Sequence, residues 1–207
     1  LRFEGAAVEP PELIEPGGGV PFSRLDVEDA IPARPIDRSA INQLLFDSLA
    51  LSAWKQAGPN RWALRVNPSS GNLHPTEGYL LVGPIDGLSE TAGLWHYRPM
   101  EHALEQRAAL SDELWRQLAG RRADDAVLLA ISSIHWREAW KYGERAYRYC
   151  QHDAGHAIAA VAYAAAGLGW RVRLVDHWPT DTLAKLIGTG DAPEEEAEHV
   201  DTLLLIG

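Results

Sequence analysis

The stretch from Ala154 to Ala166 constrains the fold strongly, because eight of its thirteen residues are alanine and apolar side chains occur all round the helix. A helix of this composition is expected to be buried, and its small side chains let neighbouring backbones approach closely. Upstream, the run AVLLAISSI at 126–134 is continuously apolar, which is typical of a strand covered on both faces. A buried helix and a doubly covered strand together predict a layered α+β or α/β domain.

Helical and strand patterns alternate along the rest of the chain. Further helices are predicted at 41–54, 111–120, 136–166 and 180–188. Asp37 or Ser39 is expected to cap the first of them and Ser111 the second, because their side-chain oxygens accept from backbone N–H groups. Strands are predicted at 76–83, 93–99, 126–134 and 201–207, with a short pairing segment after Pro99–His102 and a strand or extended connection at 171–177.

The two ends of the chain differ in composition from its middle. Residues 1–35 are rich in Pro and Gly and are expected to form an extended segment, which leaves 36–207 as one domain. Residues 192–199 are acidic and are expected to form a solvated loop. The chain begins at Leu1 rather than at Met, so we expect a piece of a longer or tandem protein.

Composition narrows the function classes. A formal net charge of -10 over 207 residues argues against a nucleic-acid binder, which needs clustered Lys and Arg to neutralise phosphates. One cysteine excludes an internal disulfide and suits a reducing compartment, so we expect a cytoplasmic protein. No stretch has the apolar length of a membrane span, and no signal peptide is evident.

The segment HDAGH places His152 and His156 four residues apart, the spacing of the zinc-protease motif H-E-x-x-H, with Asp153 in place of glutamate. A zinc site would need a third ligand and an open position for water, and Asp153 has one methylene less reach than glutamate. Cys150 is too near in sequence to complete that geometry. We therefore favour a packed helix with hydrogen-bonded histidines and no metal, and keep a metal-dependent hydrolase as the weaker alternative.

The loop and strand at 65–82, RVNPSSGNLHPTEGYLLV, form the richest polar cluster. Its hydroxyls, amide and backbone N–H groups suit the polar edge of an uncharged ring or a phosphate, and Gly71 permits a tight turn or close approach to a ligand. The P-loop spacing is absent. A plain loop between two elements is the alternative.

A basic and aromatic patch follows at 136–149, WREAWKYGERAYRY. Such a patch on an acidic chain can receive an anionic cofactor or substrate, and its Lys and Tyr side chains can serve acid–base chemistry. The alternative is a solvated helix face with snorkelling cations. A serine hydrolase is not supported, because the G-x-S-x-G elbow does not occur.

Three segments in order resemble the FMN-dependent nitroreductase superfamily. They are NPSSGNLHPTEGYLLV (67–82), GLWHYRPMEHALE (93–105) and WKYGERAYRYCQHDAGHAIAAVAYAAAGLGW (140–170). The pattern is most similar to the SagB-type dehydrogenases, which include azoline-oxidising enzymes of thiazole and oxazole peptide maturation. The resemblance runs from about Ile41 to Gly207. It implies an α+β three-layer sandwich, with a central mixed or antiparallel sheet flanked by helices and a long buried central helix.

The resemblance also implies site residues. The family's Pro-Ser-x-Gly-Asn/Ala loop lies against the flavin, so the expected FMN contacts are Pro68, Ser69, Ser70, Gly71 and Asn72. Arg65 is expected near the phosphate or the dimer partner. A Lys-Tyr pair is implicated in catalysis in SagB-like enzymes, and Lys141-Tyr142 stands at the matching place.

Further positions follow from the same resemblance. The segment that includes Val175 and Asp176 is similar to one that passes the reactive edge of the flavin, and the alanine-rich helix to one in the subunit interface. Trp136 and Trp140 are expected to line the substrate side. The implied activity is an FMN-dependent oxidoreductase that moves hydride or electrons between an organic substrate or NAD(P)H and an acceptor. Its substrate would be a small molecule or a peptide, and its assembly a homodimer or tandem pseudo-dimer.

Two departures from the family pattern support a different function. The Arg-Arg-Ser-x-Arg segment that binds the FMN phosphate has no counterpart, and Arg34 and Arg38 are thin substitutes. The basic residue that the family often supplies beyond its last strand has no counterpart before Gly207. These departures favour the alternative of a degenerate nitroreductase-like domain that serves as a non-catalytic partner or dimerisation scaffold.

Overall fold

The computed structural model describes residues 2–10, 19–27, 30–190 and 197–207. Within these ranges one sheet has the strand order β1-β6-β5-β4-β7-β9-β8, and its neighbouring strands are antiparallel. Its strands are Val8–Glu9 (β1), Thr76–Val82 (β4), Gly93–Arg98 (β5), Ala103–Ala109 (β6), Val127–Ile134 (β7), Val172–Leu174 (β8) and Glu198–Ile206 (β9). A separate hairpin pairs β2 (Leu51–Ala57) with β3 (Asn60–Arg65).

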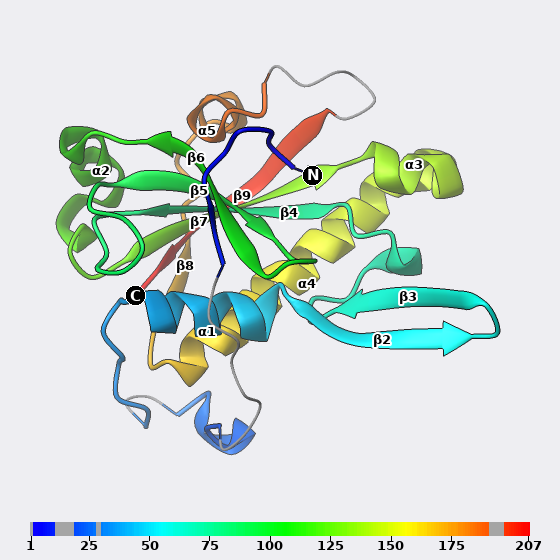
Figure 1. Cartoon of the computed structure of the whole chain (residues 1–207), viewed down its shortest axis with the longest axis horizontal. Helices are drawn as coiled ribbons and strands as arrows, with labels where there is room; N and C mark the ends of the chain where they lie inside the picture. The colour runs from blue at the N-terminus through cyan, green and yellow to red at the C-terminus, as the bar shows by residue number, and fades with distance from the viewer. Residues whose placement is uncertain (1, 11–18, 28–29, 191–196) are drawn as a thin grey trace.

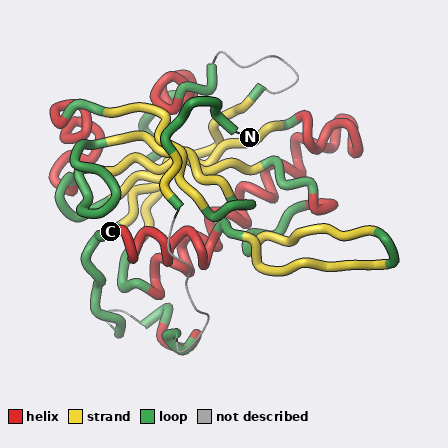
Figure 2. Tube along the Cα trace, viewed as in Figure 1, coloured by secondary structure: helices red, strands yellow, loops and turns green. Residues whose placement is uncertain are grey.

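Helices cover both faces of the sheet, so the fold has three layers (Figures 1 and 2). Helices α1 (Arg38–Ser48) and α4 (Ala146–Gly167) pack on one face, and α2 (Asp112–Ala119) and α5 (Thr180–Ile187) on the other. Successive residues of β4 enter opposite cores: Leu80 faces α1 and α4, whereas Tyr79 and Leu81 face α2 and α5. This alternation between two apolar layers explains the continuous apolar strands and confirms the predicted α+β sandwich.

Helix α4 crosses the sheet as the expected long central helix, but it is buried along one face rather than all round. Cys150, Ala157 and Val161 are fully buried against the core. His156 and Tyr163 lie on the other face and are exposed in the single chain. The alanines therefore allow close packing on the core side and leave a second, shallow face at the surface.

The prediction of one helix over 41–54 is wrong for its last residues. Asp37 caps α1 by accepting a hydrogen bond from the Ala40 amide at 2.7 Å, but the helix ends at Ser48. Leu49 and Leu51, which extended the helical spacing, are the cap of α1 and the first residue of β2. Apolar spacing could not separate these cases, because a cap and a strand start can both contact the core.

The residues AGPN at 57–60, predicted to break a helix, form the turn of the β2–β3 hairpin instead. Gly58 has φ +57°, which glycine adopts at low cost. Trp54 lies opposite Ala63, and the Arg61 guanidinium stacks 4.3 Å from the centroid of the Trp54 ring. The hairpin projects away from the main sheet toward the right of Figure 1.

The continuous helix predicted at 136–166 is interrupted near its start. Helix α3 (Trp136–Tyr142) ends at Gly143, where φ is +55°, and α4 begins at Ala146. A left-handed residue cannot continue a right-handed helix, so the chain turns here.

Several other helix and strand boundaries differ from the predicted ones. Strand β9 begins at Glu198, so the last residues of the predicted acidic loop and the region before 201 belong to the strand; residues 191–196 lie outside the described ranges. In the Pro/Gly-rich segment, residues 8–9 pair with β6 and Phe22–Arg24 form a 3-10 turn. Ser111 caps α2, as predicted, by accepting from the Leu114 amide at 3.2 Å.

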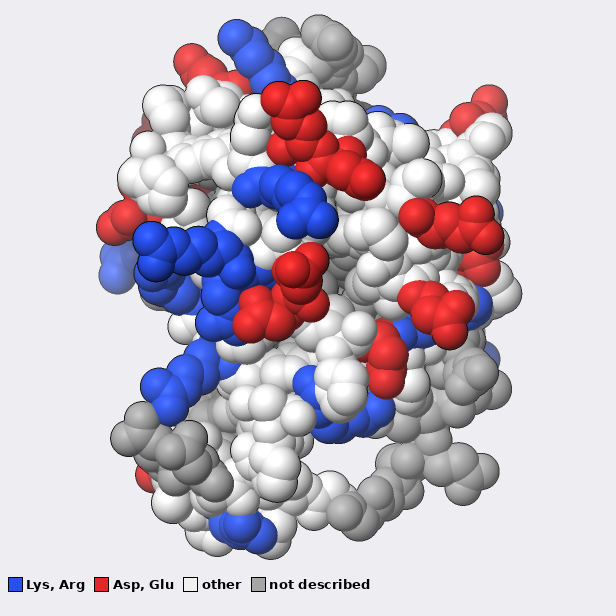
Figure 3. All heavy atoms as spheres, turned by 90° about the vertical axis from the view of Figure 1, so that its left-hand side faces the viewer, with Lys and Arg blue, Asp and Glu red and all other residues white. Residues whose placement is uncertain are grey.

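Among the described helices, none combines the length and apolar character that a bilayer span requires. The face of the molecule that carries α2 shows acidic and basic side chains interspersed (Figure 3). This face therefore offers no broad surface of one charge sign.

Candidate functional site

The loop before β4 holds an unusual backbone shape at residues 69–74. Gly71, Asn72 and His74 all have positive φ, at 63°, 60° and 52°. The Ser69 hydroxyl accepts from the His74 amide at 2.8 Å, and the Ser69 carbonyl accepts from the Asn72 amide at 3.1 Å. Three left-handed residues in six are costly for ordinary side chains, so these bonds maintain a conformation the sequence would not otherwise favour. We call residues 68–72 the glycine loop.

The buried carboxylate of Asp153 fixes the glycine loop to α4. Its Oδ1 accepts from the Ser70 amide at 2.9 Å and from the Ser70 hydroxyl at 3.0 Å. Asp153 is 0% exposed, and charge-assisted bonds of this kind are stronger than neutral ones. The acid of the HDAGH motif thus holds a loop 83 residues earlier in the chain.

The Lys141–Tyr142 pair packs directly on Gly71. A Cβ placed on this glycine would lie 2.8 Å from Lys141 Nζ and would also overlap the Tyr142 hydroxyl. The Tyr142 ring also contacts the Tyr149 ring, with centroids 4.5 Å apart. The structure therefore brings together the two candidate site segments, which are seventy residues apart in the sequence.

Glu138 is a site residue that sequence reasoning missed. It is 0% exposed, and neither carboxyl oxygen has a hydrogen-bond partner among the described residues. Burial, followed by the charge of Asp153 and opposed by Lys141, raises the pKa of Glu138 to about 7. Its place one helical turn before Lys141 was the available signal, because residues three apart on a helix are neighbours.

The remaining glycine-loop residues have different surroundings. The side-chain Nδ2 of Asn72 donates to the Ala63 carbonyl at 2.9 Å, and Asn72 Oδ1 lies 2.9 Å from His74 Nε2. This side chain therefore ties the loop to β3. Pro68 is exposed. Trp136 and Trp140 on α3 are also exposed, at 54% and 63%.

The Arg65 side chain is directed into a pocket of its own. Its Nη1 donates to the Thr76 carbonyl at 2.8 Å, and its side chain lines a separate pocket with Arg2, Arg98 and Arg137. Val175 also lies elsewhere: its amide donates to the Leu203 carbonyl of β9 at 2.8 Å, and both β9 and β7 separate it from β4. Asp176 follows Val175 and is exposed. One copy of the chain thus assembles the glycine loop with Lys141–Tyr142, but not with residues 175–176.

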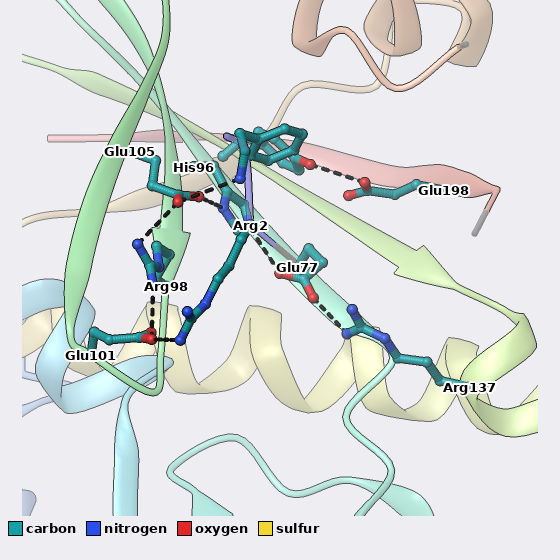
Figure 4. A network of polar contacts seen from close by, with 10 residues as sticks. Arg2, Glu77, His96, Arg98, Glu101, Glu105, Arg137 and Glu198 are labelled. Atoms are coloured by element: carbon teal, nitrogen blue, oxygen red, sulfur yellow. Dashed lines mark hydrogen bonds and ion pairs between the residues drawn. The ribbon is translucent and has the colours of Figure 1, made fainter. Parts of the chain in front are cut away.

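A buried ion network lies beside this site (Figure 4). His96 sits between two carboxylates, with Nε2 2.8 Å from Glu77 Oε2 and Nδ1 3.0 Å from Glu105 Oε2. Glu77 also accepts from Arg137 Nη1 at 2.5 Å. Burial alone would raise the pKa of Glu77, but the hydrogen bond with His96 and the charge of Arg137 lower it to about 2. Glu77 is therefore ionised at neutral pH and holds α3 against β4.

The zinc hypothesis gains no support from the geometry. The side chains of His152 and His156 are exposed on α4, whereas Asp153 points into the core toward Ser70. In the ranges that the structure describes, no three His, Cys, Asp or Glu side chains are grouped as a metal site requires.

The fold and the glycine loop define a class. The nitroreductase family profile matches residues 33–196, and the chain belongs to the nitroreductase family. The "Putative nitroreductase MJ1384" of Methanocaldococcus jannaschii is 30% identical over 108 residues, which cover 49% of this chain and 52% of that protein. The match with this curated relative thus spans about half of its length.

Solved structures share the fold. A "putative nitroreductase" from Anabaena variabilis is 22% identical with a TM-score of 0.68, covering 96% of this chain and 40% of that one. The E. coli microcin synthetase McbBCD complex with truncated pro-MccB17 bound is 20% identical with a TM-score of 0.65, covering 99% and 78%. A "putative nitroreductase" in complex with FMN from Exiguobacterium sibiricum is 11% identical with a TM-score of 0.53, covering 92% and 89%.

Proposed function

We propose that this chain is an FMN-dependent oxidoreductase that moves hydride or electrons between an organic substrate or NAD(P)H and an acceptor. The observation that carries the proposal is the convergence at Gly71. The glycine loop, the Lys141–Tyr142 pair and the buried Asp153 come from separate elements and meet at one exposed backbone turn. Family membership and the FMN complex of the Exiguobacterium neighbour support flavin as the cofactor.

The glycine loop fits the uncharged polar edge of a flavin ring. Gly71 is exposed, and its backbone N–H has no hydrogen-bond acceptor among the described residues, so this donor is available to a ligand. The side chains of Ser69, Ser70 and Asn72 are engaged within the protein and would hold the loop's shape. A rigid loop that presents a backbone donor is the arrangement that cofactor enzymes use for orientation.

FMN, when bound, would supply the redox chemistry, and the protein would supply position and charge. The Lys141 ammonium would stabilise negative charge that grows at the site, because a preplaced cation needs no reorganisation. The Tyr142 hydroxyl would hold or donate a proton. Asp153 would keep the loop fixed during turnover, and the exposed Trp136 and Trp140 would offer aromatic surface to the substrate.

We infer that the working form is a homodimer or a tandem pseudo-dimer. Helix α1 begins at Arg38, and its start lies at the end of the molecule opposite the loop between β3 and β4 (Figure 1). Arg34 precedes this helix, and its amide donates to the Leu168 carbonyl at 2.9 Å. Residues 175–176 are likewise remote from the loop in one copy. The exposed face of α4 around His156 and Tyr163 offers a surface on which a second copy would bring these parts together. Light scattering after gel filtration measures the expected doubled mass.

Within the family, we infer a SagB-type dehydrogenase that acts in the cytoplasm on a small molecule or a peptide. The three motifs support this branch, and the fold shared with the microcin synthetase complex, in which truncated pro-MccB17 is bound, is in keeping with a peptide substrate. Assays of azoline-containing peptide oxidation beside NAD(P)H-dependent reduction of nitroaromatics and quinones separate these activities.

The direct test of the cofactor is a visible absorption spectrum of the purified chain, recorded before and after FMN addition and gel filtration. Retention of a flavin spectrum supports the oxidoreductase, and titration with reduced nicotinamide then tests the electron donor. A folded dimer that retains no flavin contradicts the oxidoreductase proposal and favours the non-catalytic scaffold. That alternative has one structural point in its favour: Arg38 is already bonded to the carbonyls of Gly87 and Pro10 and is not free for a phosphate.

A further inference from the structure

The pocket that contains Arg65 has a composition unlike the rest of this acidic chain. It measures about 250 Å³, and four arginines from four separate segments line it: Arg2, Arg65, Arg98 and Arg137. The carboxylates in its wall are Glu77 and Glu101, and Leu73, Pro99 and Met100 supply apolar edges. We call this hollow the arginine pocket.

Its ion pairs leave positive charge uncompensated. Arg2 and Arg98 both bond to Glu101, and Arg137 bonds to Glu77. Behind the wall, Glu105 pairs with Arg98, whose Nη1 lies 3.1 Å from Glu105 Oε1, and it also contacts His96 at 3.0 Å (Figure 4). The four lining guanidinium groups thus share three carboxylates, Glu77, Glu101 and Glu105, which leaves an excess of one positive charge.

Arg65 is the one of these four arginines that makes no direct ion pair with a described residue. In the part of the chain that the structure describes, it has no ion-pair partner, and its one hydrogen bond goes to the Thr76 carbonyl. Its neighbour His74 adds no charge, because burial and the charge of Arg65 lower the pKa of His74 to about 4. Burial also lowers the pKa of Arg65, and the negative charge of Glu77 offsets this only in part. A sheltered charge of this kind is costly unless an anion joins it.

We propose that the arginine pocket binds an oxyanion, a carboxylate or phosphate group, with Arg65 as its main cation. A guanidinium donates two parallel N–H groups that match the oxygens of such a ligand. Arg137 lies one helical turn before Lys141, about 6 Å along the axis of α3, so a ligand anchored here can extend to the Lys141–Tyr142 pair.

Two sources of the oxyanion are compatible with this geometry: the phosphate of FMN, or the anionic end of a separate ligand. Only the choice between them rests on the proposed function. The site itself rests on charge and burial, so it can be tested without flavin.

The test is calorimetric titration of the flavin-free full chain with inorganic phosphate, at constant ionic strength in a phosphate-free buffer. Met100→Glu adds a negative charge at the exposed rim and should weaken phosphate binding about threefold, from Coulomb's law across a solvated distance. Glu101→Gln removes a negative charge and should strengthen binding by a similar factor. Leu114→Glu and Glu113→Gln make the same charge changes on the exposed side of α2, outside the pocket, and should leave binding unchanged.

Absence of phosphate binding, or binding that responds equally to pocket and control variants, overturns the proposal. The source of the oxyanion is identified with Arg65→Lys, which keeps the positive charge but loses the two parallel N–H donors of the guanidinium. If this variant weakens FMN binding but not riboflavin binding, the flavin phosphate is the ligand. If phosphate binds equally well to flavin-loaded protein, the pocket serves a separate ligand. The oxyanion site stands in both cases, even where no flavin is retained and the oxidoreductase proposal fails.

Discussion

Asp153 Oδ1 accepts hydrogen bonds from both the amide and the hydroxyl of Ser70, at 2.9 and 3.0 Å. The carboxylate is buried in the first turns of the central helix, and the serine lies in the loop that faces Lys141–Tyr142. The helix therefore serves as a support that sets the position of the glycine loop.

Asp153→Asn should loosen this support, because an amide oxygen carries no negative charge and an NH2 donor replaces Oδ2, which also accepts from the Ser70 amide at 3.1 Å. Hydrogen bonds to charged groups contribute about 1.5–3 kcal/mol, so FMN affinity should fall roughly 10- to 100-fold. Fluorescence titration of flavin measures this loss, and hydrogen exchange at the Ser70 amide should speed up even without flavin. Asp47→Asn on the exposed face of α1 is the control. Unchanged exchange at Ser70 would show that Asp153 is not the support.

Asn72→Ala should weaken flavin retention more than His156→Ala does. The Asn72 side chain bonds to Ala63 and His74, and its backbone is left-handed, a conformation that asparagine tolerates better than alanine. His156 is exposed on α4. Flavin and metal content after gel filtration measure both variants. If activity and metal are lost with His156→Ala while flavin has no effect, the metal-dependent alternative is correct.

Gly71→Ala should disable the site with little effect on the fold. The new Cβ would displace Lys141 Nζ, 2.8 Å away, and the Tyr142 hydroxyl. Gly58→Ala is a matched control, because Gly58 also has positive φ but its added Cβ meets nothing within 4 Å. In both variants the free energy of unfolding should fall by about 1–2 kcal/mol, because alanine disfavours positive φ. Only Gly71→Ala should lose activity. Equal activity in the two variants would place the reaction away from Gly71.

Lys141→Met and Tyr142→Phe should each lower turnover about 100-fold, the range of a positioned acid–base or charged group. Flavin binding should change little, because the glycine loop keeps its support from Asp153. Stopped-flow reduction kinetics and flavin titration separate these effects. Lys185→Met, at an exposed position on α5, should behave as the unchanged chain. Wild-type turnover in both site variants would exclude the pair from catalysis.

Glu138→Gln should remove a pH dependence of stability. The folded pKa of Glu138, about 7, lies above the unfolded value of about 4.3, so between them the folded state binds more protons. The free energy of unfolding should therefore fall as pH rises through this interval, and the glutamine variant should be more stable above pH 7 by about 1–3 kcal/mol. Urea unfolding at several pH values measures the difference. The exposed Glu113→Gln should show none, and parallel pH profiles for wild type and Glu138→Gln would mean that Glu138 is solvated.

Local pattern was sufficient for elements whose residues act on near neighbours. The apolar run at 126–134 became β7, because both faces of that strand meet a core, and Ser111 caps α2 through a bond three residues away. The β2–β3 hairpin was missed because its stability lies in cross-strand pairs such as Trp54 with Ala63, and helical spacing continued by chance through Leu51.

The candidate site was likewise predicted only in part from the sequence. The glycine loop and the Lys141–Tyr142 pair were predicted from motifs, because their residue types carry a chemical signature. Glu138 and the arginine pocket were not, because burial and missing partners are properties of the packed molecule.

The sequence by itself determined the layered α+β class, the family and the segments that carry polar chemistry, because periodicity, caps and motifs depend on residues that are close together in the chain. Tertiary structure alone decided that Asp153 supports Ser70, that Gly71 meets Tyr142, and that Arg65 lies in a pocket without a direct ion pair to a described residue. Each of these depends on residues brought together by sheet and helix packing, where distance and exclusion of water set the strength of the interaction.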